Sequence, residues 1–225
     1  MTPTPADTDD NTDDGPTTAE QPVVPSVDST PAADWAEVRL GSGVEPPDDI
    51  PPHTGPRTVI RTFAFLDLCG STEFLEREGT RASIDLVSEF RALVREVSAR
   101  RGVRVAKWLG DGAMLVGVRT GPVLATATEI CSRQQYQPLP ARAGVAVSPV
   151  LLFDGDDYLG RAANFAARIC DDAPPGRVLC DQDCADSIPE WVEQVGAQQV
   201  SVRGMGTFNV LVLNADARTT PLRPH

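Results

Sequence analysis

Patterns typical of β-strands and patterns typical of α-helices follow one another along the chain from Val59 onward. Apolar runs predict strands over residues 58–68, 103–109, 113–118, 141–153, 177–181 and 207–214. Apolar residues at helical spacing predict helices over 71–102, 122–135 and 158–173, with a short helix after Asp181. The sequence Gly110-Asp111-Gly112 indicates a hairpin turn between two of the strands.

Helices that cross between strands, together with one hairpin, predict an α+β fold of the ferredoxin-like type. In this fold helices cover one face of a mixed sheet. A fold of this kind serves many functions, so the functional argument depends on particular residues.

The charge of the chain is unevenly distributed. Residues 1–50 contain twelve Asp and Glu but only one basic residue, Arg39, and so carry nearly all of the net charge of −12. This segment is also rich in Pro and Thr, and it buries too little apolar surface to offset the entropy lost on ordering. We predict a disordered acidic tail and linker over 1–57, one domain over 58–215 and a C-terminal tail over 216–225.

Composition also restricts the partners and the location of the protein. The domain is nearly neutral and the tail is acidic, which argues against binding to nucleic acid. No apolar run is long enough to span a bilayer and no signal peptide is evident, so we expect a cytoplasmic protein without membrane insertion. The five cysteines form no CxxC pair, which favours reduced thiols in or near the core.

Two aspartates are placed where a metal could bind. Asp67 ends the first predicted strand, and Asp111 lies in the turn of the next hairpin. If these strands are neighbours, both carboxylates project from one edge and offer oxygen ligands to two hard cations such as Mg²⁺ or Mn²⁺. Alternatively, Asp67 caps the following helix and Asp111 only makes the turn.

The segment between Asp67 and the first helix is suited to binding phosphate. Gly70 lets the backbone approach a ligand, and the amides of Ser71 and Thr72 lie at the start of a helix, where phosphate oxygens are attracted. No GxxxxGK[ST] sequence is present, so this is not a Walker loop.

Four further polar residues are candidates for substrate binding. Lys107 lies four residues before Asp111, and Asn164 and Arg168 share one helix face. Asp157 precedes that helix. Each has an ordinary alternative: a strand-edge charge, solvated helix residues and a loop acid.

Three segments in order resemble the class III nucleotidyl cyclases, the family of adenylate and guanylate cyclase catalytic domains. They are FLDLCGST (65–72), KWLGDG (107–112) and DYLGRAANFAAR (157–168). The likeness extends from about Thr58 to Asn214, and residues 142–181 resemble the actinobacterial branch.

The resemblance implies a role for each site residue. Asp67 and Asp111, assisted by the carbonyl of Leu68, would bind two divalent cations that activate the ribose 3′-hydroxyl and hold the triphosphate. Lys107 and Asp157 would read adenine. Asn164 would orient the ribose, and Arg168 would stabilise charge in the transition state.

The family also implies a symmetric homodimer, in which each active site takes its metals from one subunit and its base-reading and transition-state residues from the other. The reaction would convert a nucleoside triphosphate, most simply ATP, into a 3′,5′-cyclic nucleotide and pyrophosphate. Met205 stands where relatives often have a phosphate-binding lysine, with Arg203 as a possible substitute. Trp108 is larger than usual beside Lys107, which puts the base preference in doubt.

Three other functions remain open at this stage. A pyrimidine cyclase would make cyclic UMP or cyclic CMP as an antiphage signal; a guanylate cyclase is less favoured by Lys107 and Asp157. A catalytically silent nucleotide-binding module is the remaining candidate, although such modules usually lose a metal aspartate or the arginine, and this chain has both.

Overall fold

The computed structural model describes residues 57–153 and 157–215. The predicted tail and linker, apart from Arg57, and the predicted C-terminal tail lie outside the described residues, so both remain predictions. The described part of the chain confirms the α+β fold class.

A single mixed sheet of eight strands organises the described residues. The strands lie in the order β2-β3-β1-β4-β6-β8-β7, and β5 pairs with β4 outside this path. Neighbouring strands are antiparallel except for β4 and β6, which are parallel. Their bounds are Arg57–Leu68 (β1), Arg104–Leu109 (β2), Gly112–Gly117 (β3), Ala141–Phe153 (β4), Asp157–Leu159 (β5), Val178–Asp181 (β6), Val192–Val202 (β7) and Gly206–Ala215 (β8).

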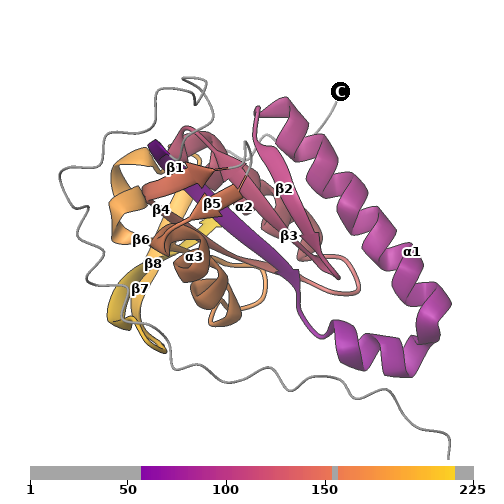
Figure 1. Cartoon of the computed structure of the whole chain (residues 1–225). Helices are drawn as coiled ribbons and strands as arrows, with labels where there is room; N and C mark the ends of the chain where they lie inside the picture. Colours follow the sequence, from indigo (N-terminus) through magenta and orange to yellow (C-terminus); the bar gives the residue numbers. More distant parts are fainter. Residues whose placement is uncertain (1–56, 154–156, 216–225) are drawn as a thin grey trace, which may run out of the picture. The chain divides into compact units, whose positions relative to one another are not determined.

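Helices lie on both faces of this sheet (Figure 1). α1 (Ser71–Arg100) and α2 (Thr120–Gln134) pack on one face, hereafter the α1–α2 face. α3 (Arg161–Asp171) packs on the other, hereafter the α3 face. The prediction that the helices cover one face of the sheet is therefore correct for α1 and α2 but wrong for α3, which covers the other face.

The reason is that β4 is apolar on both sides. Ala143 and Val145 belong to the core under α1 and α2, whereas Ala146 and Val150 belong to the core under α3. A strand that is buried on both faces needs a covering layer on each.

The first helix is bent near its start, as Figure 1 shows at the right of the molecule. Gly79 has φ 83° and ψ 173°, outside the helical region, so a short leading segment meets a longer one there. In the longer segment Leu86, Phe90, Val94 and Val97 are buried, at the helical spacing expected from the sequence.

Three elements differ from the sequence-based expectation. The helix expected over 158–173 begins only at Arg161, because the residues before it form the three-residue strand β5. The short helix after Asp181 is a 3₁₀ helix, η2 (Gln182–Ser187). β7 was not predicted, because it is an edge strand whose exposed positions carry polar residues such as Glu193 and Gln194.

Gly144 offers a test of how closely α3 lies on β4. A Cβ atom there would lie 2.2 Å from the carbonyl oxygen of Ala166 and 2.5 Å from the amide nitrogen of Cys170, so α3 would have to move. We expect Gly144→Ala to lower the free energy of unfolding by about 1–3 kcal/mol in urea denaturation. Gly196→Ala is the matched control, because nothing lies within 4 Å of its Cβ position. Equal stability of the two variants would contradict this packing.

Candidate active site

Asp67 and Asp111 lie at the same edge of the sheet, because β1 and β3 are antiparallel neighbours. Leu66 pairs with Ala113, which sets Asp67 beside the turn that holds Asp111. The approach requires glycine: a Cβ on Gly112 would lie 2.6 Å from the carbonyl oxygen of Leu66 and 3.7 Å from Oδ1 of Asp67. The predicted adjacency of the two strands is confirmed.

The side chain of Asp67 does not cap α1. The N-cap residue is Gly70, in the left-handed conformation at φ 79°, and no side chain caps the helix. Instead, Arg142 donates to Oδ2 of Asp67 from Nε at 3.1 Å and from Nη2 at 2.8 Å. Burial alone would lower the pKa of Arg142, but the hydrogen bond and charge of Asp67 outweigh this and raise it.

The donors at this edge suit a hard cation. Among the described residues, no three His, Cys, Asp or Glu side chains cluster as a ready metal site. Asp67 and Asp111 supply carboxylates, and the backbone carbonyl of Leu68 follows directly on β1. Mg²⁺ is commonly held by one or two carboxylates while water and substrate phosphates complete its shell, so this donor set fits such an ion.

The start of α1 supplies exposed groups beside this edge. Gly70 is exposed and Ser71 is partly exposed, and the first intrahelical bond runs from Phe74 N–H to the carbonyl of Gly70. The amides of Ser71 and Thr72 precede that bond and belong to the turn that has no partner within the helix. Their predicted role in phosphate binding remains a prediction.

Lys107 and Asp157 come together although they are 50 residues apart in sequence. Nζ of Lys107 lies 3.5 Å from Oδ1 of Asp157, and both side chains are exposed. They line a cavity of about 180 Å³ on the α3 face together with Phe63, Arg104, Ala106, Met114, Tyr158 and Ala163. A donor and an acceptor side by side above an apolar floor can read the edge of a nucleobase.

Arg168 lies in the same cavity as Asp67. This cavity, of about 260 Å³, is lined by Phe65, Leu66, Asp67, Leu109, Gly112, Ala167, Arg168, Cys170 and Asp171. Among the described residues Arg168 has no ion-pair partner, so its guanidinium is available to an anionic ligand. Asn164 is exposed one turn earlier on α3 and lines neither cavity.

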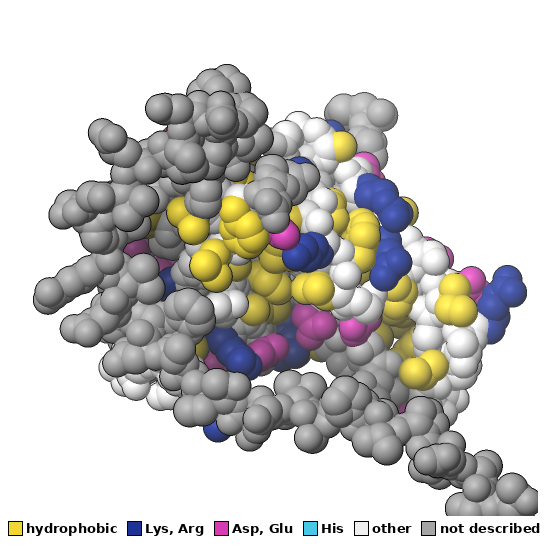
Figure 2. Space-filling model, viewed as in Figure 1, with side chains coloured by type: hydrophobic (Ala, Val, Ile, Leu, Met, Phe, Trp, Pro, Cys, Tyr) yellow, Lys and Arg dark blue, Asp and Glu magenta, His cyan; other side chains and the backbone are white. Residues whose placement is uncertain are grey.

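Both cavities therefore open on the α3 face. Figure 2 shows this face, where acidic and basic side chains lie together beside a band of apolar surface. The structure thus brings four of the predicted side chains to cavities on this side of the sheet, Asp67, Lys107, Asp157 and Arg168, while Asp111 lies in the turn beside Asp67.

The large ring of Trp108 lies on the opposite face of the sheet from Lys107. Lys107 pairs with Met114, which belongs to the α3-face core, whereas Trp108 pairs with Ala113 of the α1–α2 core. The guanidinium groups of Arg91 and Arg95 lie 5.1 and 4.9 Å from the Trp108 ring centroid. The ring therefore does not line the cavity that holds Lys107 and Asp157, and the base preference remains a prediction.

Met205 is a packing residue. Its side chain packs against the α3-face core, and it lies in the same turn as the exposed Arg203. A thioether in this environment offers no charge to a phosphate. Arg203 lines neither cavity, so its use as a substitute for the family lysine remains a prediction.

Two residues of the candidate site were not identified from the sequence. Arg142 stands in an apolar strand and its partner Asp67 is 75 residues away, so no local pattern links them. Tyr158 was assigned to a helix, but it lies on β5, where its ring meets Phe63 edge-on and its hydroxyl accepts from Arg104 at 3.2 Å. For Arg142, the available signal was a charged residue inside the otherwise apolar strand sequence Ala-Arg-Ala-Gly-Val.

None of the five cysteines forms a disulfide bond, so all five are free thiols. Burial raises the pKa of Cys131 and raises that of Cys170 to about 12, so these two stay protonated at neutral pH. The prediction of reduced thiols in or near the core is confirmed for Cys69, Cys131, Cys170, Cys180 and Cys184, four of which are buried.

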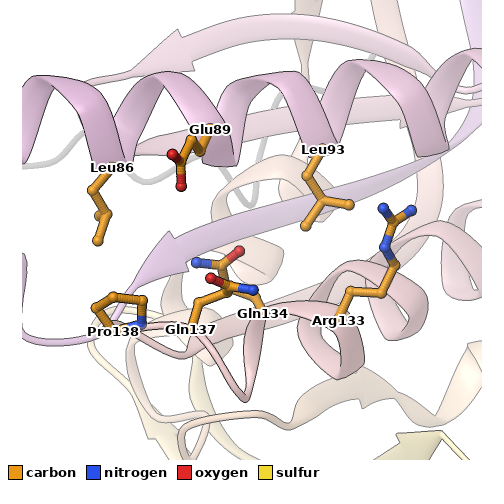
Figure 3. Close-up of a pocket in the computed structure, with 7 residues that line it drawn as sticks. All are labelled: Leu86, Glu89, Leu93, Arg133, Gln134, Gln137 and Pro138. Atoms are coloured by element: carbon orange, nitrogen blue, oxygen red, sulfur yellow. The ribbon is translucent and has the colours of Figure 1, made fainter.

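A separate hollow of about 170 Å³ lies between α1 and the end of α2 (Figure 3). Leu86, Glu89 and Leu93 of α1 face Arg133, Gln134, Gln137 and Pro138 across it. The Gln134 amide already donates to the carbonyl of Leu139 at 3.0 Å. None of the predicted site residues lines this hollow, so it is separate from the candidate active site.

No family model matches the chain. Among curated proteins, it is 30% identical over 164 residues to an adenylate cyclase of Glutamicibacter nicotianae, covering 71% of this chain and 40% of that protein. It is 32% identical over 136 residues to an uncharacterized protein of Mycobacterium tuberculosis, covering 60% of this chain and 36% of that protein. The chain thus matches well under half of the length of these relatives.

Solved cyclase domains share the fold. The catalytic core of a rhodopsin-guanylyl cyclase with converted specificity, in complex with ATPαS, aligns with a TM-score of 0.62 at 17% identity, covering 72% of this chain and 99% of that chain. The adenylyl cyclase CyaB from P. aeruginosa aligns with a TM-score of 0.60 at 20% identity, covering 72% and 97%. The fold is therefore that of a cyclase catalytic domain.

The shared fold and the adenylate cyclase relatives together support the predicted resemblance to the class III nucleotidyl cyclase family. Within the described residues, no helix is both long enough and apolar enough to cross a membrane.

Proposed function

We propose that the domain is a nucleotide cyclase that converts ATP into 3′,5′-cyclic AMP and pyrophosphate. The observation that carries the proposal is the sheet edge where Asp67 lies beside the turn that holds Asp111, with Arg168, which has no ion-pair partner among the described residues, on the same face. A cation-binding edge and an available guanidinium, brought together between two copies of this face, would supply what transfer at a phosphorus atom requires. We expect the reaction to take place in the cytoplasm.

Asp67, Asp111 and the carbonyl of Leu68 would hold two divalent cations, Mg²⁺ or Mn²⁺. Bound there, the cations would lower the pKa of the ribose 3′-hydroxyl and neutralise charge on the triphosphate. The amides at Gly70, Ser71 and Thr72 would bind phosphate oxygens from the start of α1.

The residues of α3 and the base pocket would orient the substrate. Arg168 would stabilise negative charge as it develops on the phosphates, and Asn164, one turn earlier, would hold the ribose. Lys107 would donate to a ring nitrogen of adenine while Asp157 accepts from its exocyclic amine. Guanine presents a carbonyl where adenine has that amine, so the pair favours adenine.

The active sites would form between two copies of the chain. Asp67, Lys107, Asp157 and Arg168 line cavities on the α3 face, where the side chain of Leu109 is 45% exposed at the cavity beside Asp67. Face-to-face association would bury such apolar surface and would set the metals of one copy opposite Arg168 and Asn164 of the other. We therefore propose a symmetric homodimer with two equivalent sites.

Replacing either aspartate tests the reaction itself. We expect Asp67→Ala and Asp111→Ala each to reduce cyclic nucleotide formation by at least about 100-fold, because each removes a cation ligand. EDTA should abolish the activity of the unmodified protein. The assay is mass detection of the cyclic product, with circular dichroism to show that the fold is kept.

Asp85→Ala is the control. Asp85 lies in an exposed ion pair with Arg81 on α1, so this variant should retain activity. Full activity in Asp67→Ala, or no turnover of any nucleoside triphosphate by the unmodified protein, would refute the proposal.

The base preference is tested by offering ATP, GTP, CTP and UTP separately. We expect cyclic AMP as the dominant product, and we expect Lys107→Met and Asp157→Asn each to reduce the preference for ATP about 10-fold or more, because each leaves one base group unpaired. A dominant pyrimidine product would instead identify a pyrimidine cyclase.

The shared active site is tested by complementation between two inactive variants. In co-expressed Asp67→Ala and Arg168→Ala chains, half of the dimers are mixed, and each mixed dimer has one intact site of two. We therefore expect about a quarter of the unmodified activity to return. Each variant alone should be inactive. If mixing restores nothing although mixed dimers are isolated with two affinity tags, each site is formed within one chain.

A further inference from the structure

The turn that carries Asp111 is contacted by a side chain from α1. Nη2 of Arg91 donates to the backbone carbonyl of Gly110 at 2.6 Å. α1 runs alongside β2 (Figure 1), so a residue from the longer segment of the helix can reach the turn between β2 and β3. Among the described residues, the side chain of Arg91 makes no other hydrogen bond and no ion pair.

We propose that Arg91 is a positioning residue, which holds the peptide group between Gly110 and Asp111 so that the carboxylate of Asp111 is oriented for cation binding. The inference rests on the proposed role of Asp111 as a cation ligand. Arg91 belongs to the helix that packs on the α1–α2 face, so it would act through the turn and not by contact with the nucleotide.

The ring of Trp108 determines where the guanidinium of Arg91 lies. The guanidinium carbon is 5.1 Å from the ring centroid, within the range of a cation–π contact. Nε of Arg91 is buried and has no hydrogen-bond partner among the described residues. The planar group is therefore supported by an aromatic ring and not by a carboxylate, and its Nη2 is directed to the carbonyl of Gly110.

The turn needs such a contact because Asp111 has a glycine on each side, and glycine backbones are conformationally permissive. Gly112 is packed: a Cβ there would lie 2.6 Å from the carbonyl oxygen of Leu66. Gly110 is not packed, because a Cβ there would meet nothing within 4 Å. The carbonyl of Gly110 and the amide nitrogen of Asp111 belong to one planar peptide unit. A hydrogen bond to that carbonyl therefore fixes the backbone from which Asp111 projects.

Charge alone predicts the opposite effect on cation binding. Arg91 is a cation beside the turn, so by simple repulsion its removal should strengthen the binding of a divalent cation at Asp111. If Arg91 positions the turn, its removal should weaken this binding. The two explanations therefore differ in the sign of one measured quantity.

Arg95 offers a matched control. Its guanidinium lies 4.9 Å from the centroid of the same Trp108 ring, one helical turn further along α1. Within the described part of the chain, however, Arg95 makes no hydrogen bond to the turn. Arg95→Met therefore removes an equal charge from the same ring but leaves the contact with Gly110 in place.

The first measurement is hydrogen–deuterium exchange of the full-length protein without metal or nucleotide, read by mass spectrometry. We expect Arg91→Met to accelerate exchange in peptides that cover residues 109–113 by about 5-fold or more, because the turn loses a charge-assisted hydrogen bond. Arg95→Met should exchange as the unmodified protein does. This readout does not depend on the proposed reaction.

The second measurement is Mn²⁺ binding without nucleotide, by electron paramagnetic resonance of free Mn²⁺. We expect Arg91→Met to weaken the Mn²⁺ binding that is lost in Asp111→Ala by about 5-fold or more, and Arg95→Met to leave it unchanged. In turnover assays, kcat of Arg91→Met should fall about 10-fold, with a smaller change in KM for the nucleotide.

Trp108→Leu is a second route to the same effect, because it keeps Arg91 but removes the ring that supports it. We expect a smaller weakening of Mn²⁺ binding, and adding Arg91→Met to this variant should weaken binding by less than Arg91→Met does alone. Thermal unfolding of all variants separates loss of positioning from loss of the fold.

Several results would overturn the inference. Unchanged or tighter Mn²⁺ binding by Arg91→Met, or unchanged exchange at the turn, would show that Arg91 does not position Asp111. Equal weakening in Arg95→Met would assign the effect to the charged ring surface and not to the hydrogen bond. Failure of the unmodified protein to bind Mn²⁺ through Asp111 would also remove it. If Mn²⁺ binding depends on Asp111 and Arg91 but no nucleotide is cyclised, the proposed function fails and the positioning role stands.

Discussion

The pairing register of β1 with its two neighbours is the constraint on which the candidate site depends. Against β3, the register sets Asp67 beside Gly112; against β4, it pairs Asp67 with Arg142. Because side chains alternate between the faces of a sheet, a shift of one residue would turn Asp67 toward the α1–α2 core and bring an apolar residue to the edge. The register is fixed by apolar side chains on both faces, such as Phe63 under α3 and Leu66 under α1 and α2.

Much of the fold follows from local patterns. The strand predicted over 141–153 has those bounds, and the hairpin at Gly110–Gly112 forms where the turn residues indicate it. β5 and β7 could not be predicted, because a three-residue strand has no periodicity and an exposed edge strand needs few apolar residues. The position of α3 on the α3 face could not be predicted either, because it depends on a tertiary contact: Gly144 has no side chain, so the backbone of α3 can pack directly against β4.

The candidate site, like the fold, could be predicted only in part from the sequence. Asp67, Asp111, Lys107 and Arg168 were found from residue type, spacing and family resemblance, and the sheet brings Asp67 and Arg168 to one cavity. Arg142 could not be found in this way, because its hydrogen bonds reach 75 residues back to β1 and 29 residues forward to α3. The orientation of Trp108 was also beyond the sequence, because the irregularity in β2 between Val105 and Lys107 resets which face each later residue occupies.

The ion pair between Lys107 and Asp157 has a consequence for ligand choice. In the absence of a nucleotide, each charge already has a partner 3.5 Å away at the mouth of the cavity. Under the proposed function, an entering base would separate them, and the separation would be compensated only by a base that offers an acceptor to the ammonium and a donor to the carboxylate together. A base that matched only one of them would leave the other charge without a partner beside the ring of Tyr158. Discrimination at this pocket would therefore require both matches at once.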